Sequence, residues 1–144
     1  MQKLSFLLVI LFSVTLSYSQ KSNKDSEIFT VVESMPVFSK KCVLYSGDRQ
    51  NQCTIKAIQN YSAGVDYPQK AINADAEGKV YIRFVVQKNG KVKDVRLLRS
   101  SGYEILDDVA FKHIKKMPKF AKPGYQRGKP VKVQYNIPII FKLG

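Results

Sequence analysis

The segment that most constrains the fold is KVYIRFVVQKNGKVKDVRLLRS, residues 79–100. Apolar and polar residues alternate over its first half, where one face consists of Val80, Ile82, Phe84 and Val86. Asn89-Gly90 then supplies the residue pair that two-residue hairpin turns favour, and Val95 and Leu97 continue the buried face in the return half. We therefore predict an antiparallel β-hairpin with one face buried against a second layer.

A helix and a final strand follow the hairpin. Within residues 100–117, apolar-side residues recur at helical spacing at Leu106, Val109, Ala110, His113, Ile114 and Met117. Residues 131–143 alternate again with the period of a half-buried strand. The order strand, strand, helix, strand predicts an α+β fold. We expect a two-layer module in which a small antiparallel sheet (β-β-α-β) has a helix packed on one face.

Pro138 interrupts this otherwise regular final strand. Proline has no N–H to give to a ladder and is tolerated mainly at a sheet edge or a bulge, so we predict an edge strand. Because alternate residues direct their backbone groups to opposite sides, one rim is shared by Gln134, Asn136, Pro138 and Ile140. Two interpretations stay open on these grounds. Either the rim accepts a strand from another protein, or Pro138 only prevents aggregation between sheets.

Short elements and two cysteines precede the hairpin. Residues 28–38 are typical of an extended segment, residues 54–64 of a short helix, and residues 69–78 of a second helix. Cys42 and Cys53 lie in a polar, turn-like stretch, and in an oxidising compartment such a pair most simply closes one local disulfide loop. By loop-closure entropy this bridge would add roughly 2 to 3 kcal/mol to the stability.

The N-terminal residues have the pattern of an export signal. Lys3 precedes an apolar run over residues 4–16, and small residues follow that run. We predict a cleaved signal peptide at residues 1–19, a flexible tail at residues 20–27 and a soluble, exported product. The alternative is an uncleaved membrane anchor, although this run is shorter than the roughly 20 residues that a spanning helix needs.

The charge is strongly one-sided, with 24 Lys and Arg against 11 Asp and Glu and a net charge of +13. In an exported protein this balance favours anionic envelope polymers, lipid headgroups or an acidic protein over nucleic acid, and it also serves solubility. The cations that would hold peptidoglycan or another anionic polymer are Lys112, Lys115, Lys116, Lys119, Lys122, Arg127 and Lys129. One candidate function is therefore a basic cell-envelope binding module without energy transduction.

The sequence does not indicate an enzyme. His113 is the single histidine, and it lies on the apolar side of the predicted helix. Asp107 and Asp108 are neighbours that point about 100° apart on a helix, so they cannot act as a facing acid/base pair. The sequence has no recognisable nucleophile motif and no Gly-rich loop that leads from a strand into a helix. We predict a non-enzymatic protein with no cofactor and no metal.

Many residues occur in an order that resembles a known family. The matching positions are Tyr67, Pro68, residues 78–86, Asn89, Gly90, Val95, Ser101, Gly102, Leu106, Asp107, Ala110, residues 118–120, residues 128–131 and the terminal VQYNIPIIFKL. Together with the upstream IFTVVESMPVF, they resemble the TonB C-terminal domain family in the form common in Bacteroidetes. The resemblance covers residues 28–143. It implies a TonB C-terminal-like domain at residues 67–144, preceded by an N-terminal extension at residues 28–66 that contains the disulfide loop.

The resemblance implies a periplasmic protein of TonB-dependent transport. If the N-terminal run is not cleaved, the alternative is an inner-membrane anchored protein facing the periplasm. The last strand of this family pairs with the TonB box, a short extended peptide of outer-membrane transporters. That role falls here on Gln134, Tyr135, Asn136, Ile137, Pro138, Ile139 and Ile140, with Arg127 and Lys129 flanking them. Formation of a homodimer through exposed edges would compete with the peptide. The chain has only six scattered prolines and no long Pro-rich linker, so it favours peptide docking over energy transduction itself.

Overall fold

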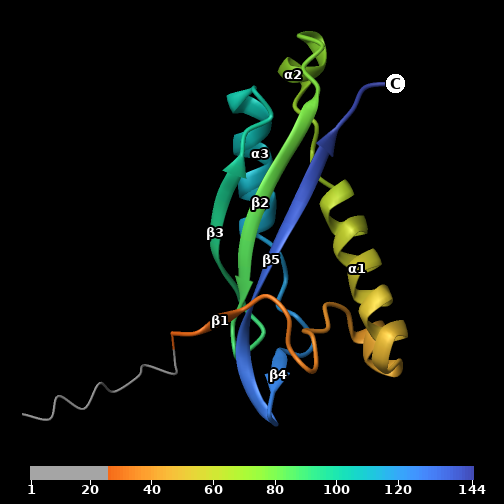
Figure 1. The fold of residues 1–144 in the computed structure, drawn as a ribbon. Coiled ribbons are helices and arrows are strands. Elements are labelled where there is room, and N and C mark those ends of the chain that lie inside the picture. Colours follow the sequence, from red (N-terminus) through yellow and green to blue (C-terminus); the bar gives the residue numbers. More distant parts are fainter. Residues whose placement is uncertain (1–25) are drawn as a thin grey trace, which may run out of the picture.

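A computed structural model describes residues 26–144 (Figure 1). The predicted signal peptide and most of the predicted tail lie outside the described residues. In chain order the elements are β1 (Ile28–Phe29), the 3-10 helix η1 (Lys40–Leu44), α1 (Gly47–Ala63), α2 (Gln69–Asn73), β2 (Gly78–Val86), β3 (Val92–Arg99), α3 (Glu104–Lys115), β4 (Gly124–Gln126) and β5 (Lys129–Phe141). The sheet order is β1-β5-β2-β3, and β4 also pairs with β5. Within residues 26–144, every helix is too short or too polar to cross a membrane.

The predicted hairpin is confirmed as β2 and β3, which pair antiparallel. At its turn the Gln87 N–H donates to the Lys91 carbonyl at 2.8 Å, and the Gly90 N–H donates to the Gln87 carbonyl at 2.8 Å. The Asn89 side chain accepts the Lys91 N–H at 3.0 Å. Gly90 has a φ of +84°, a conformation that a residue with a Cβ adopts only with strain, which explains the glycine at this position.

β3 departs from strict alternation at two register shifts. One separates the pairs made by Tyr81 and Ile82, and the other includes Asp94, whose φ is +51°. Val95 remains on the core side and is partly buried there, as predicted. Leu97 lies opposite Ile82 but is 44% exposed, so the expectation that it is buried is wrong. The reason is that β3 is the outermost strand and has neighbours on one side only.

α3 covers one face of the sheet. Figure 1 shows it behind β2 and β3, and its buried side chains join those of the hairpin in one core. The largest fully buried side chains of that core are Phe84, Phe120, Ile82, Leu106 and Ile114. Burial of such side chains contributes roughly 1.5 to 3 kcal/mol each. The two-layer α+β fold is therefore confirmed.

Asp107 fastens the start of α3 to the end of β3. Its carboxylate accepts the Ser101 N–H at 2.8 Å and the Ser101 hydroxyl at 2.7 Å, and it also accepts the Ser100 hydroxyl. Burial alone would raise the pKa of Asp107, but these hydrogen bonds favour the charged form and bring the pKa below its ordinary value. Its neighbour Asp108 instead contacts Lys112 at 2.7 Å. The two carboxylates thus have separate structural partners.

The helix predicted at residues 54–64 is longer than expected. α1 begins at Gly47, within the stretch that we expected to be turn-like, and ends before Gly64 as predicted. The Gln50 side chain organises this region because it donates to the Cys42 carbonyl at 3.2 Å and to the Tyr45 carbonyl at 2.7 Å. The polar residues between the two cysteines therefore belong in part to the exposed first turns of α1 rather than to a loop.

Two other predicted segments are shorter than expected. α2 stops at Asn73 rather than near residue 78, and Asp75 just beyond it has a φ of +50°. Within the predicted extended segment at residues 28–38, only Ile28–Phe29 forms a strand. Isolated bridges then connect Ser34 and Val37 to the segment that follows α3.

Candidate functional site

β5 has one paired edge and one open edge. On one side it pairs with β2 without interruption from Val133 to Phe141. On the other side β1 pairs only with Lys132 and Val133, in parallel. From residue 134 onward this second edge has no strand partner within residues 26–144. In this part β5 is the edge strand that Pro138 predicts.

Pro138 defines which backbone groups face the open edge. It lies opposite Tyr81 within the continuous pairing of β5 and β2. A proline nitrogen directed at β2 would delete a ladder bond, so the continuous register directs the Pro138 nitrogen outward. By alternation the same rim holds the backbone groups of Gln134, Asn136, Pro138 and Ile140. All four of these residues offer a carbonyl there, and all but the proline offer an N–H.

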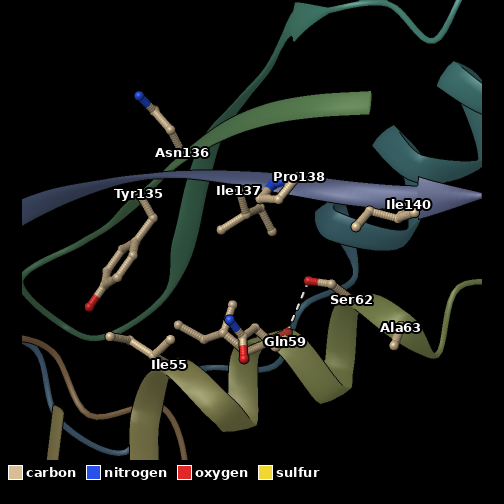
Figure 2. Close-up of a pocket in the computed structure, with 10 residues that line it drawn as sticks. Ile55, Gln59, Ser62, Ala63, Tyr135, Asn136, Ile137, Pro138 and Ile140 are labelled. Carbon is tan, nitrogen blue, oxygen red and sulfur yellow. Dashed lines mark hydrogen bonds between the residues drawn. The ribbon is translucent and has the colours of Figure 1, made fainter. Parts of the chain in front are cut away.

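α1 runs beside this open edge and leaves a groove of about 550 Å³ (Figure 2). β5 contributes Tyr135, Asn136, Ile137, Pro138 and Ile140 to its lining, and α1 contributes Ile55, Ile58, Gln59, Ser62 and Ala63. Figure 2 shows Tyr135 and Ile137 pointing toward α1, whereas Asn136 points away from it. The Ser62 hydroxyl donates to the Ile58 carbonyl at 2.9 Å, so it is satisfied within its own helix. The groove is therefore mainly apolar.

The aromatic floor of the groove is rigidly packed. The Tyr135 ring stacks on Phe84 with centroids 5.4 Å apart and also approaches Phe120 at 5.9 Å. Burial raises the pKa of the Tyr135 phenol, so this group stays neutral at physiological pH. The floor thus presents an uncharged aromatic surface.

Two attachments hold α1 in place beside the groove. Near its C-terminal end, the Tyr61 hydroxyl donates to the His113 carbonyl at 3.0 Å, and the His113 Nε2 donates to the Tyr61 carbonyl at 2.8 Å. The two rings also stack at 4.5 Å. Toward the other end, the predicted disulfide between Cys42 and Cys53 is confirmed, with the Cα atoms 5.6 Å apart. His113 therefore joins two helices.

Replacing both cysteines with serine is expected to lower the free energy of unfolding by roughly 2 to 3 kcal/mol, because the unfolded chain regains the entropy of an open loop. The thermal midpoint should fall by about 10 °C in a domain of this size. Circular dichroism on heating measures the change. The wild-type protein under reducing conditions serves as the control and should match the Cys42→Ser/Cys53→Ser variant. Equal midpoints for the oxidised wild type and the variant would contradict this expectation.

The residues predicted for partner binding fall in two places. Residues 134–140 form the open edge, although the Ile139 side chain is fully buried in the core rather than in the groove. Arg127 and Lys129 lie at the turn between β4 and β5, on the other side of the β1 pairing, and do not line the groove. The Arg127 N–H donates to the Glu33 carboxylate there at 3.3 Å. The structure thus brings together the strand residues but not the flanking cations.

The α1 side of the groove is the part that the sequence did not reveal. Ile55, Gln59 and Ala63 are exposed helical residues, and Ile55 remains 52% exposed although it is apolar. The sequence signal was present, since Ile55 and Ile58 belong to the predicted helix at residues 54–64. Their position beside β5 follows only from the tertiary packing of α1 against α3.

Comparisons with known proteins found a matching family model and similar solved structures. The family model described as Gram-negative bacterial TonB protein C-terminal matches residues 63–143. The solution structure of a Helicobacter pylori TonB C-terminal domain is 25% identical and covers 73% of this chain and 94% of that one, with a TM-score of 0.53. A Pseudomonas aeruginosa TonB C-terminal domain is 26% identical, with coverages of 55% and 78% and a TM-score of 0.46. A search of curated proteins gave no match.

Proposed function

The chain belongs to the Gram-negative bacterial TonB protein C-terminal family, and from this premise we propose that it binds the TonB box of an outer-membrane transporter by adding it as a strand to β5. The family is a non-enzymatic, transport-related domain of the cell envelope, and TonB C-terminal domains interact with outer-membrane transporters. The proposal for this chain concerns the docking of an extended peptide in the periplasm.

The observation that carries the proposal is the open edge at residues 134–140 beside an apolar groove. An added strand would satisfy the outward N–H groups of Gln134, Asn136 and Ile140 and the outward carbonyls of these residues and of Pro138. Alternate side chains of that strand would then face the groove toward Ile55 and Ala63 of α1. The backbone provides affinity in such an arrangement, and the groove selects apolar side chains.

The other edge of the sheet is a poor receptor for a peptide. β3 contains two register shifts and the positive φ of Asp94, so its outer backbone groups are out of phase with a regular strand. Exposed Arg96 and Arg99 add charge to this edge. Bulges and charges are the devices by which proteins prevent pairing at an edge. The contrast between the two edges supports β5 as the docking strand.

Amide hydrogen exchange measured by NMR tests the proposal. A synthetic TonB-box peptide is expected to protect the Asn136 and Ile140 amides, which face outward in the free protein. The Ile137 and Ile139 amides face β2 and should be protected already. A peptide N-methylated at alternate residues cannot complete the ladder and serves as the control. New protection at β3, or no change along β5, would contradict strand addition.

A further inference from the structure

The sheet face opposite α3 carries an array of cations. Opposed residues of two antiparallel strands point to the same side, so the register determines its members. Arg96 lies opposite Arg83, Arg99 opposite Tyr81, and Lys93 opposite Val85. Lys79 belongs to the same side of β2 by alternation. We call Lys79, Arg83, Lys93, Arg96 and Arg99 the basic sheet face.

The two register shifts in β3 create this array. Strict alternation would place Lys93 and Arg99 on one face of β3 and Arg96 on the other. Each shift adds one residue between successive pairs, so positions three apart in the sequence face the same way. The irregularity that makes β3 a poor receptor for a peptide therefore also brings its three cations to one side.

These charges are not neutralised within the protein. Across residues 26–144, none of the five cations has a carboxylate partner within salt-bridge distance. Arg83 and Arg96 are directly opposed, an arrangement of like charges that destabilises a sheet. The Arg83 Nε is buried and has no hydrogen-bond partner among the described residues. Such an arrangement is stabilised when an anion binds to it.

The side chains around the array are neutral and amphipathic, and Val85 within it is fully buried. The neighbouring β5 side chains are amides, with the Gln134 Nε2 donating to the Asn136 Oδ1 at 3.2 Å. The Arg99 guanidinium lies 5.9 Å from the centre of the Tyr81 ring. Figure 1 shows this side of β2 and β3 toward the viewer, with α3 behind the sheet. Leu98, which lies between the two cations Arg96 and Arg99 in the sequence of β3, is apolar and 51% exposed.

We propose that the basic sheet face rests on a membrane surface that contains anionic phospholipids. The four exposed cations of this face can contact a plane of phosphate groups together, and guanidinium groups bind phosphate through two parallel hydrogen bonds. Tyrosine and exposed apolar side chains suit the interface between water and lipid. The basic surface on α3 differs in one respect, because Lys112 there already contacts the Asp108 carboxylate at 2.7 Å.

This inference is independent of the proposed peptide site. The groove lies on the α1 side of β5, whereas the cations lie on the opposite side of β2 and β3. Both surfaces are therefore free to be occupied together. A protein held to a membrane by the basic sheet face would keep the open edge of β5 available to a transporter.

Cosedimentation of the purified protein with vesicles tests the proposal. Vesicles of phosphatidylcholine alone are compared with vesicles that also contain phosphatidylglycerol. We expect binding only to the anionic vesicles, and a loss of about 100-fold in Arg83→Gln/Arg96→Gln/Arg99→Gln, because each cation near such a surface contributes roughly fivefold. The matched control Lys115→Gln/Lys116→Gln/Lys119→Gln removes the same charge from the helix side and should lose much less.

The outcomes separate the alternatives. Equal losses in the two triple variants would overturn the proposal, because binding would then follow total charge alone. Binding to isolated peptidoglycan without binding to anionic vesicles would also overturn it. Because Arg83 is partly buried, the variant Lys79→Gln/Lys93→Gln/Arg96→Gln, limited to exposed positions, repeats the test without a risk to the fold. Peptide binding should persist in both sheet variants.

Discussion

Asn136→Pro is expected to weaken binding of a TonB-box peptide about 100-fold while leaving the domain folded. The Asn136 N–H faces the open edge, so its removal spares every bond between β5 and β2. The bound peptide would lose one hydrogen bond and retain an unsatisfied carbonyl, which together cost about 2 to 4 kcal/mol. The proline ring would also narrow the space for the incoming backbone.

Titration calorimetry measures this effect, and two variants define its cause. Asn136→Ala keeps the backbone N–H and should bind within a few-fold of the wild type, because its side chain points away from α1. Ile137→Pro removes an N–H that faces β2 and should instead destabilise the domain itself. If Asn136→Pro and Asn136→Ala bind the peptide equally, strand addition at this edge is wrong.

Gly90→Ala is expected to lower the free energy of unfolding by about 3 kcal/mol or more. An alanine at a φ of +84° is strained by roughly 1 to 2 kcal/mol. Its Cβ would also lie 2.8 Å from the Phe120 carbonyl oxygen, so the backbone must move. That movement would disturb the hydrogen bond from the Phe120 N–H to the Gly90 carbonyl, which is 2.9 Å long.

Gly102→Ala is the matched control for this substitution. Gly102 also has a positive φ, of +93°, but a Cβ there would meet no atom within 4 Å. The loss of stability in Gly102→Ala should therefore be limited to the conformational strain. The difference in the free energy of unfolding between the two variants then reports the contact between the hairpin turn and Phe120. Denaturant unfolding measures both. Equal losses at the two positions would show that this contact contributes nothing.

The sequence predicted the elements whose signals are local. Asn89-Gly90 and the flanking alternation identified the hairpin, and Pro138 identified an open edge because a proline excludes a central strand on chemical grounds. The same local reasoning failed where tertiary contacts decide. α1 begins at Gly47, in a stretch whose sequence has no apolar helical pattern. The contacts in this stretch are made by the Gln50 side chain and by the bridge between Cys42 and Cys53.

The candidate site was predictable only on its strand side. The alternation of apolar and polar residues predicts which backbone groups of residues 134–140 face the open edge. The α1 side of the groove depends on packing between segments that are far apart in the sequence, and no local pattern in the sequence predicts that packing. The basic sheet face was hidden for another reason. Lys93, Arg96 and Arg99 recur every three residues, a spacing that belongs to neither face of a regular strand, and only the two register shifts align them.

The double attachment of α1 has a consequence for the thermodynamics of docking. A helix held by a covalent bridge near one end and by the Tyr61 and His113 pair near the other has little conformational freedom left to lose. The groove is thus preorganised, and in the proposed docking the ordering entropy of association would fall on the peptide alone. Cleavage of the bridge would transfer part of that penalty to the protein, so affinity would depend on the redox state although neither sulfur touches the peptide.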